Sequence, residues 1–417
     1  MLRRAFVLLL GPAVLAGCTG VGGGYYPPGA GGGPIGLGQP APVIAAPRGP
    51  VAILLPLTGP HADIGQPMLQ AAQLALAAPG SPPLLVKDTG GNPQVAAAAA
   101  AAVIAQGARL ILGPLTSAET AAVAPAARGA GVEVLAFTND PAQAQPGVWT
   151  LGITPGQQVR RLIAAAQAQG RTQAAALLPE NDFGHAMALA LTQAAASLGL
   201  PAPTVYFHGQ GMASVNSSAR QLADYANRRG PIEAKIRQAR ALNTPEGRKQ
   251  AQDLAKTPIP PAPFNVLLLA DTGEALGEVA SMLAYYDVDR PQVQIVGPLL
   301  WAARSSGSSQ MPGGWYAAPD PAARTTFAQE YAAKYGMPPP PLADLAFDAA
   351  SIARVLAGAG GYSVAALTQP AGFVGADGWL ALLSDGQVRR GLAVFRVERG
   401  GPEMIEPAPQ SAAGTGA

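Results

Sequence analysis

Residues 51–65 read Val-Ala-Ile-Leu-Leu-Pro-Leu-Thr-Gly-Pro-His-Ala-Asp-Ile-Gly, so that five apolar residues lead into a loop containing Gly, Pro and polar side chains. Residues 65–78 follow with the alanine- and leucine-rich composition of a helix. A short continuous apolar run followed by a helix is typical of a strand that is buried on both faces of a parallel sheet. This stretch therefore predicts the first strand–loop–helix unit of an α/β domain.

The same unit recurs along the chain, with further helices predicted at 95–106, 157–169 and 184–198. Because apolar runs and helices alternate, the sequence predicts parallel sheets covered by helices on both faces. In such sheets ligands bind in the loops beyond the carboxyl ends of the strands. The expected strands are residues 51–55, 84–88, 109–113, 132–137, 174–178, 264–269 and 294–296.

The composition excludes several classes of protein. The 417 residues carry a formal net charge of +2, and 12% of them are charged, about half the usual share for a soluble protein. A near-neutral charge argues against an unspecialised nucleic-acid binder, which needs a basic surface. The single cysteine excludes a disulfide framework and a cysteine-based zinc site. Hydrophobic residues, at 49%, suffice for a large core in two domains or in one two-lobed domain.

The amino-terminal residues 1–17 have the pattern of a secretory signal peptide. Arg3 and Arg4 precede an apolar run at 5–16, which is shorter than the roughly 20 residues of a membrane-spanning helix. The segment ends in Leu15-Ala-Gly-Cys18, which resembles the bacterial lipobox. Removal of the signal with its two arginines would leave a net charge of zero.

The lipobox resemblance implies that Cys18 becomes the acylated first residue of a lipoprotein, held in a membrane by two or more acyl chains. Thr19 stands where an Asp would indicate retention in the inner membrane, which favours the outer membrane, with the protein facing the periplasm. The alternative is a soluble secreted protein with a chance cysteine. Residues 18–47 are mostly Gly, Pro and Ala and carry no charge, so we expect a flexible tether.

Four loops that follow predicted strands carry a resemblance to a known family. In order they read Leu55-Pro-Leu-Thr-Gly-Pro-His-Ala-Asp-Ile-Gly65, Lys87-Asp-Thr-Gly-Gly-Asn92, Leu112-Gly-Pro-Leu-Thr-Ser117 and Ala136-Phe-Thr-Asn-Asp140, and Leu178-Pro-Glu-Asn-Asp-Phe-Gly184 follows them. From residue 51 to about residue 400, the chain resembles the type I periplasmic binding proteins of the leucine/isoleucine/valine receptor group. The resemblance implies two Rossmann-like lobes of parallel sheet flanked by helices, joined by three crossovers, with a ligand cleft between them.

The resemblance also implies how the chain is divided. One domain is expected at residues 48–400, followed by a disordered tail at 401–417. Lobe 1 is expected to contain residues 51–153 and 320–372, and lobe 2 to contain residues 154–319 and 373–400.

Hydroxyl side chains in the lobe 1 loops are the first candidates for the ligand cleft. Thr116 and Ser117 lie where a helix begins, and hydroxyls with free backbone N–H groups suit a carboxylate; the alternative is a simple helix cap. Thr138 adds a second strand-end hydroxyl, or it caps a turn before Pro141. His61 lies in the first loop, where relatives often place an aromatic lid residue; the alternative is a loop surface residue.

The second lobe departs from the receptor pattern. In amino-acid receptors of this family, an acid just after a Gly-Pro is expected to hold the ligand ammonium, and here Leu299 occupies that position. An ammonium group facing leucine would lose its charge partner in a dry cleft. Asp271 is the candidate substitute, unless it caps the helix that starts near Glu274. Leu299 therefore weakens the prediction of amino-acid transport.

A basic segment is the second departure. Residues 220–256 hold nine basic and four acidic residues, and we predict a helical insertion at 213–258 that Pro231 and Pro245 break into short helices. The insertion is either a solvated helical surface or a basic docking arm for an anionic or protein partner.

Three further segments carry a narrower resemblance: Leu283-Ala-Tyr-Tyr-Asp-Val-Asp-Arg290, Gly297-Pro-Leu-Leu-Trp301 and Gly313-Gly-Trp-Tyr-Ala-Ala-Pro-Asp320. Together with the basic insertion and the lipobox, they resemble the penicillin-binding-protein activator lipoproteins, over the binding-protein half of those proteins. The resemblance implies stimulation of a bifunctional peptidoglycan synthase from the outer membrane. The alternative is a substrate-binding lipoprotein of a branched-chain-like amino-acid ABC transporter.

Catalysis finds no support in the sequence. The chain contains no Gly-x-Ser-x-Gly, His-Glu-x-x-His or Gly-x-x-x-x-Gly-Lys motif. Its three histidines, His61, His185 and His208, are too scattered to suggest a metal site by spacing. We therefore expect no enzyme, no catalytic residue, no metal and no cofactor.

Overall fold

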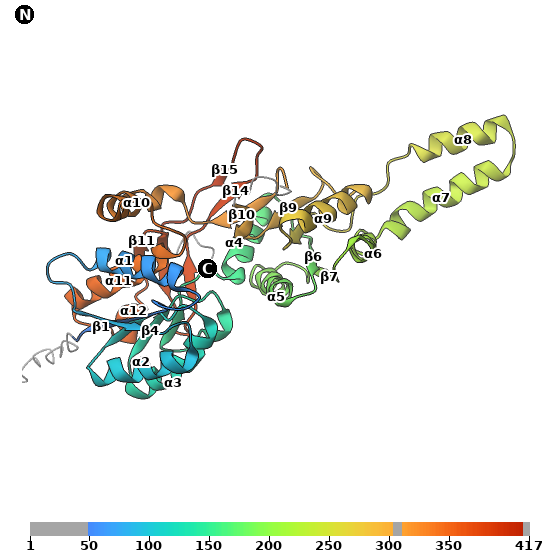
Figure 1. Cartoon of the computed structure of the whole chain (residues 1–417). Coiled ribbons are helices and arrows are strands. Elements are labelled where there is room, and N and C mark those ends of the chain that lie inside the picture. Colours follow the sequence, from blue (N-terminus) through green and yellow to red (C-terminus); the bar gives the residue numbers. More distant parts are fainter. Residues whose placement is uncertain (1–48, 303–310, 412–417) are drawn as a thin grey trace, which may run out of the picture. The chain divides into compact units, whose positions relative to one another are not determined.

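The structure, a computed structural model, describes residues 49–302 and 311–411. In these residues it is an α/β protein whose parallel strands alternate with helices, as the sequence predicts (Figure 1). The signal peptide expected at 1–17, the acylation site Cys18 and the tether expected at 18–47 lie outside the described residues. None of the helices that the structure describes is long and apolar enough to cross a membrane.

The first sheet contains five parallel strands in the order β2-β1-β3-β4-β5. Val51, Ile53 and Leu55 point to one face of the sheet and Ala52 and Leu54 to the other, and all five are buried. Helices α1 and α11 cover the first face, and α2 and α3 cover the second. The elements are β1 (Val51–Leu55), α1 (Ala62–Ala75), β2 (Leu84–Asp88), α2 (Pro93–Ala105), β3 (Leu110–Leu112), α3 (Ser117–Ala130), β4 (Glu133–Ala136), η1 (Pro141–Gln143), β5 (Val148–Thr150), α10 (Pro321–Tyr335), α11 (Ala343–Ala359) and α12 (Val364–Leu367).

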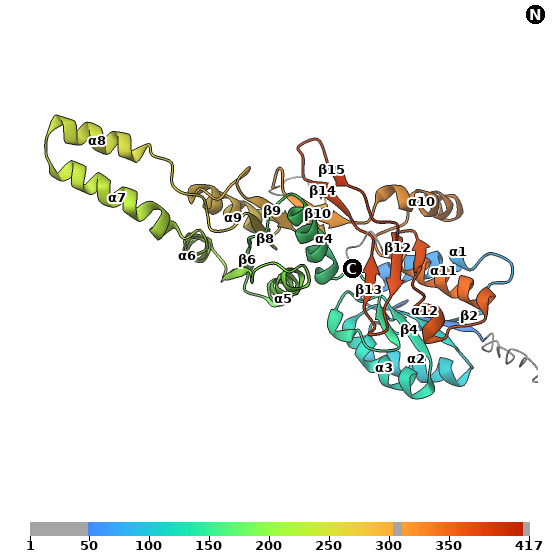
Figure 2. The ribbon, with the colours of Figure 1, turned by 180° about the vertical axis from the view of Figure 1, so that it is seen from behind.

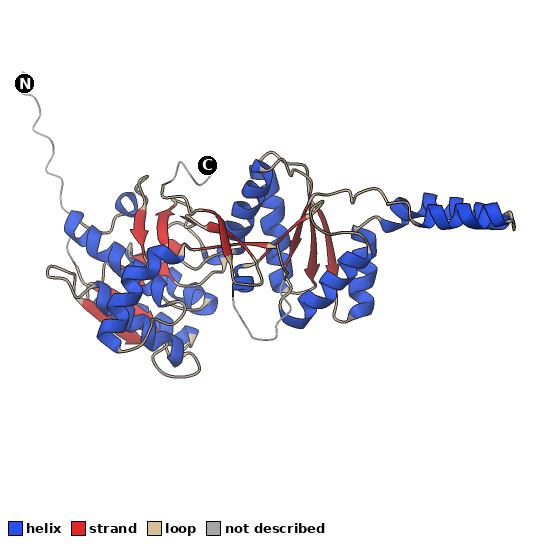
Figure 3. Cartoon of the chain, turned by 90° about the horizontal axis from the view of Figure 1, so that it is seen from above, coloured by secondary structure: helices blue, strands red, loops and turns tan. Residues whose placement is uncertain are grey.

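The second sheet contains seven strands in the order β15-β14-β10-β9-β8-β6-β7, of which β14 and β15 are antiparallel to their neighbours. Helices α4 and α5 pack on one face of this sheet, and α6 and α9 pack on the other. Figure 3 shows helices on both sides of the strands. The elements are α4 (Pro155–Ala168), β6 (Ala174–Pro179), α5 (Asp182–Ser197), β7 (Thr204–His208), α6 (Met212–Leu222), α7 (Tyr225–Ala241), α8 (Pro245–Ala255), β8 (Val266–Leu269), α9 (Gly273–Tyr285), β9 (Gln294–Gly297), η2 (Leu299–Ala302), β10 (Trp315–Ala318), β14 (Ala393–Arg396) and β15 (Glu403–Glu406).

A three-stranded antiparallel sheet of β11 (Phe373–Gly375), β12 (Gly378–Leu382) and β13 (Val388–Arg390) corrects the expected lobe boundary (Figure 2). The sequence analysis assigns residues 373–400 to lobe 2, yet this sheet buries Phe373, Leu380 and Val388 in the core of lobe 1. The Trp149 Nε1 atom also donates a hydrogen bond of 2.6 Å to the Leu383 carbonyl. The apolar face of the small sheet is thus covered by lobe 1, and only β14 and β15 belong to the sheet of lobe 2.

The tail expected to be disordered from residue 401 begins instead with an ordered edge strand. Residues 403–406 form β15, whose Met404 pairs with Phe395 of β14. The strand supplies the backbone hydrogen bonds that the edge of β14 would otherwise lack. Residues 412–417 lie outside the described residues.

The insertion is shorter than the predicted 213–258. Helix α6 buries Val215, Ala219 and Leu222 in the lobe 2 core, so its residues belong to the lobe. Pro231 lies inside α7 and does not break it, whereas Pro245 begins α8 after the cap residue Thr244. Contacts of the α7 side chains with α8 hold the helix continuous in spite of the hydrogen bond lost at Pro231.

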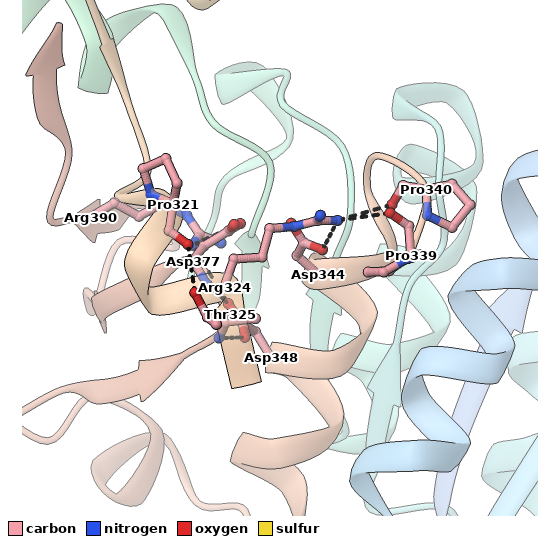
Figure 4. Close-up of polar contacts among 10 residues, drawn as sticks. Pro321, Arg324, Thr325, Pro339, Pro340, Asp344, Asp348, Asp377 and Arg390 are labelled. Carbon is pink, nitrogen blue, oxygen red and sulfur yellow. Dashed lines mark hydrogen bonds and ion pairs between the residues drawn. The ribbon is translucent and has the colours of Figure 1, made fainter. Parts of the chain in front are cut away.

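A buried charge cluster lies beside the segments through which the chain passes between the two sheets, at 151–154, 319–320 and 391–392 (Figure 4). The Arg390 NH2 atom donates to the Leu151 carbonyl at 2.8 Å. Its NH1 atom lies 3.5 Å from an Asp377 carboxylate oxygen and 3.8 Å from one of Asp348. One guanidinium thus faces two carboxyl groups at the junction of two crossovers.

The two carboxyl groups share one positive charge in a site closed to water. Burial, together with the charge of Asp377, raises the pKa of Asp348 to about 7, and burial raises the pKa of Asp377 to about 6. Arg390 opposes both increases. The Asp348 carboxylate also accepts the Ala376 N–H at 2.5 Å, which orients it. Nearby, Arg324 pairs with Asp344 through two hydrogen bonds of 2.7 Å each.

We expect this cluster to make the protein less stable as the pH rises from about 4 to about 7. Both carboxyl pKa values are raised above the ordinary 3.8, so the folded state binds more protons than the unfolded state in this interval. Denaturant unfolding of the full chain should show a loss of several kcal/mol, because each unit of raised pKa corresponds to about 1.4 kcal/mol. In Asp348→Asn, which keeps the acceptor for Ala376, the part of the loss that comes from Asp348 should disappear, and the smaller part that comes from Asp377 should remain. Parallel pH profiles for the two proteins would contradict the assignment.

Candidate functional site

The predicted hydroxyl residues of lobe 1 meet at the carboxyl ends of β3 and β4. The Ser117 Oγ atom lies 2.9 Å from the Thr138 Oγ1 atom, although the two residues come from different loops. Thr138 is buried, and its hydroxyl also accepts the Asp140 N–H at 3.1 Å. The structure therefore brings Ser117 and Thr138 together into one hydroxyl pair.

Thr116 forms the cap of α3. Its hydroxyl accepts the Glu119 N–H at 3.2 Å and donates to the Glu119 Oε2 atom at 2.8 Å. The Thr116 N–H donates to the same carboxylate oxygen at 3.1 Å. Glu119 is fully buried, and its Oε1 atom has no hydrogen-bond partner among the described residues. A carboxyl group of the protein therefore already engages the Thr116 hydroxyl and N–H group at the helix start where a ligand carboxylate was expected.

The first two loops are tied together by Asp88, which the sequence analysis did not single out. Its carboxylate accepts the N–H groups of Leu57, Thr58 and Gly90 and the Thr58 hydroxyl at 2.6 Å. Burial acts to raise the pKa of Asp88, but these four hydrogen bonds outweigh it and lower the pKa. The sequence could have indicated Asp88, because it ends the strand predicted at 84–88 and lies in the Lys87-Asp-Thr-Gly-Gly loop.

His61 lies at the start of α1 and makes no side-chain cap. Its ring lies beside Gly91, where an added Cβ would be 3.4 Å from the His61 Cδ2 atom. Gly91 has a φ of 71°, which favours glycine. His61 is partly exposed at the loop surface, and among the described residues no hydrogen bond joins it to the Ser117–Thr138 pair.

Asp271, the candidate for an ammonium group in lobe 2, is paired with a buried histidine. Its Oδ2 atom lies 3.2 Å from the Nε2 atom of His208, the last residue of β7. The other His208 ring nitrogen lies 3.0 Å from the Gly209 carbonyl. Both partners are acceptors, so the ring is best satisfied as an imidazolium that donates to both. Asp271 does not cap α9, because Thr272 holds the cap position.

Sequence reasoning missed His208 because 63 residues separate it from Asp271. Burial acts to lower the pKa of His208, but the hydrogen bonds that the ring donates to Asp271 and to the Gly209 carbonyl, together with the negative charges of Asp271 and Glu278, outweigh burial and raise the pKa above its ordinary 6.5. The charge of Asp271 is therefore neutralised within the protein. The proximity of His208 and Asp271 follows from the sheet: β7 and β8 are both parallel to β6, so the carboxyl ends of the two strands lie at the same edge of the sheet.

Leu299 presents an apolar surface where the receptor pattern places an acid. It begins η2 and packs against the cluster that contains Tyr316 and Phe395. Its N–H group donates to the buried Gln158 Oε1 atom at 2.7 Å. Neither its side chain nor its N–H group is thus available to a charged ligand.

We expect the His208–Asp271 pair to be visible by NMR titration. His208 should titrate above pH 6.5 in the wild-type protein, and its pKa should fall below that value in Asp271→Asn, because burial then acts without a carboxylate partner. The stability that this pair contributes should be complete below about pH 6.5 and be lost as the pH rises through the folded-state pKa.

A His208→Gln variant assigns the resonance in that experiment, and the exposed His185 serves as the internal reference. An unchanged His208 pKa in Asp271→Asn would show that the carboxylate does not hold the charge.

The family model for periplasmic binding proteins matches residues 50–402. The chain belongs to this family. The family consists of binding proteins, and in the described residues no group of three or more His, Cys, Asp or Glu side chains is placed to hold a metal ion. No curated protein matches the chain in sequence.

Solved structures of two kinds resemble the fold. A putative branched-chain amino acid ABC transporter protein from Rhodospirillum rubrum is 20% identical, with 86% of this chain and 99% of that chain covered, at a TM-score of 0.63. Full-length LpoA from Haemophilus influenzae is 17% identical over 86% of this chain, at a TM-score of 0.60. Only 58% of that LpoA chain is covered. Its C-domain, described as a regulator of PBP1A, is 17% identical, with 85% of this chain and 99% of that domain covered, at a TM-score of 0.59.

Proposed function

We propose that this protein is a non-catalytic periplasmic lipoprotein that regulates peptidoglycan synthesis by binding a bifunctional peptidoglycan synthase. The observation that carries the proposal is the absence of a free acid at either candidate position on the lobe 2 side. Leu299 is apolar there, and the carboxylate of Asp271 is neutralised by His208. An amino-acid ammonium would find no charge partner at either position and would lose its hydration as the cleft closed.

The lobe 1 side supports the same proposal. An amino-acid receptor needs an open helix start for the ligand carboxylate. At α3, the buried Glu119 carboxyl group accepts the hydroxyl and the N–H group of Thr116. A second carboxylate beside Glu119 would meet like-charge repulsion in a site with little water.

Two further points concern the location and the partner. The lipobox ending at Cys18, followed by Thr19, supports acylation and attachment to the outer membrane, facing the periplasm. The fold shared with the C-domain of the PBP1A regulator supports a synthase partner. The basic segment and the three loop segments described for the activator group support it as well.

The second candidate function is an amino-acid receptor of an ABC transporter. The hydroxyl pair of Ser117 and Thr138 favours it, because two hydroxyls at strand ends suit a ligand carboxylate. In that case His61, Ser117 and Thr138 would contact the ligand.

The two functions separate in one pair of measurements on the full chain in detergent. We expect no change in the unfolding midpoint with any amino acid, and an increased turnover of the purified bifunctional synthase from the same genome. A ligand at about a thousand times its dissociation constant would add about 4 kcal/mol and raise the midpoint by several degrees.

A clear shift with one class of amino acid would instead support the receptor. The shift should then be lost in the double variant Ser117→Ala with Thr138→Val. If the protein is a regulator, Leu299→Ala should leave the turnover of the synthase unchanged. Unchanged synthase turnover with the wild-type protein would overturn the proposal.

A further inference from the structure

Residues 225–256, called the arm below, consist of α7, a turn and α8, and the two helices lie side by side (Figures 1 and 2). Ile236, Ala239 and Ala251 are buried between the helices in a small core that is separate from the cores of lobe 2. Gly247 permits close approach, because a Cβ there would lie 2.4 Å from the Ala239 carbonyl oxygen. The arm is thus a preformed helical hairpin.

The base of the arm is fixed by the buried side chain of Arg228. Its guanidinium donates to four backbone carbonyls, those of Pro260 at 2.7 Å, Ala223 at 3.0 Å, and Tyr286 and Asp287 at 3.1 Å each. These carbonyls belong to the chain entering the arm, the chain leaving it and the end of α9. One side chain therefore holds the arm on lobe 2.

Three exposed arginines line one side of the hairpin. Each directly follows a residue buried between the helices: Arg237 follows Ile236, Arg240 follows Ala239, and Arg248 follows Gly247. Both helices are right-handed and run in opposite directions, so the residue after each contact position points to the same side of the pair. These three residues are called the arginine face.

The opposite side of the hairpin differs in charge. Lys235, Glu246 and Asp253 each precede a contact residue, so they lie on that side and include both signs of charge. Arg229 is paired with Glu233 at 2.9 Å within α7. No ion pair joins the arginine face to any residue that the structure describes. Three arginines thus lie on one side, together with Glu233, which follows Ile232 and is paired with Arg229, whereas one lysine and two acidic residues lie on the other side.

We propose that the arginine face is the surface with which this protein docks onto a carboxylate-bearing face of its protein partner. The inference rests on the proposed function, because it names the bifunctional peptidoglycan synthase as that partner. Guanidinium groups form two parallel hydrogen bonds to a carboxylate, and Arg237 and Arg240 are one helical turn apart. Leu242, 60% exposed, lies at the turn next to Gly247 and supplies an apolar anchor at the end of the hairpin.

A protein partner fits this surface better than a lipid surface. Among the described residues of the arm, Leu242 is the single large apolar side chain that is strongly exposed. Helices that lie on membranes present a broad apolar face with basic residues around it. The cell-wall polymer is the other periplasmic source of carboxylates, and it is a separate arm of the test.

The test compares two triple variants of the full chain that lose the same charge. Arg237→Gln, Arg240→Gln and Arg248→Gln remove the arginine face, whereas Lys235→Gln, Lys249→Gln and Lys256→Gln remove three exposed charges elsewhere on the arm. Binding to the purified synthase from the same genome is measured for each. We expect the first variant to raise Kd about tenfold or more, and the second to change it less than about twofold.

Each outcome decides the proposal. A rise from about 0.1 to about 0.3 M salt should weaken synthase binding more in the wild-type protein than in the variant without the arginine face, and this result would support the proposal. Equal losses in both variants would overturn it in favour of unspecific charge. If the wild-type protein binds the synthase and the variant without the arginine face binds it equally well, the inference is overturned and the proposed function stands. Failure of the wild-type protein to bind the synthase would overturn both.

Vesicles of phosphatidylglycerol and phosphatidylethanolamine and purified cell-wall sacculi are the remaining probes. Binding to either that depends on the arginine face, with synthase binding unaffected, would replace the protein partner. Equal unfolding midpoints of the two variants, with the helix content of the wild-type protein, show that the arm is folded in both.

Discussion

The guanidinium of Arg390 is the contact on which the two-lobed arrangement depends most. Arg390 is the last residue of β13, where the chain leaves the small sheet for lobe 2, and its guanidinium binds the carbonyl of Leu151 in the first crossover. Two buried carboxyl groups, Asp348 and Asp377, hold it in place from α11 and from the turn before β12. A charge this deeply buried is costly without partners, so the positions of these two crossovers are coupled to each other.

The sequence predicted the strands well because β1, β3 and β4 are continuous apolar runs that parallel sheets with helices on both faces require. It did not predict where residues 373–390 pack. An antiparallel hairpin with one apolar face can be covered by either lobe, and only the tertiary contact with Trp149 decides between them. Met404 and Ile405 of β15 were likewise too few apolar residues to indicate a strand.

The candidate site was predicted in part. Ser117 and Thr138 both end or follow strands of one sheet, so their proximity follows from parallel topology. For Thr116 the sequence left two roles open, a ligand contact or a helix cap, and the structure shows the cap, in which Glu119 binds Thr116. The pairing of Asp271 with His208 depends on the order of β7, β6 and β8, which local patterns do not specify. The charged groups of Asp271 and His208 near the strand ends thus pair with each other, whereas no ion pair joins the arginine face to a described residue.

The attachment of the arm has a consequence for how such a chain changes in evolution. Arg228 spans the carbonyls of Ala223 and Pro260, so the two ends of the inserted segment lie within reach of one guanidinium. Ends held that close let the intervening chain lengthen, shorten or change sequence with little cost to the host fold. Because the clamp binds backbone atoms only, the flanking side chains are free to vary. The hairpin is thus a variable module on a constant body.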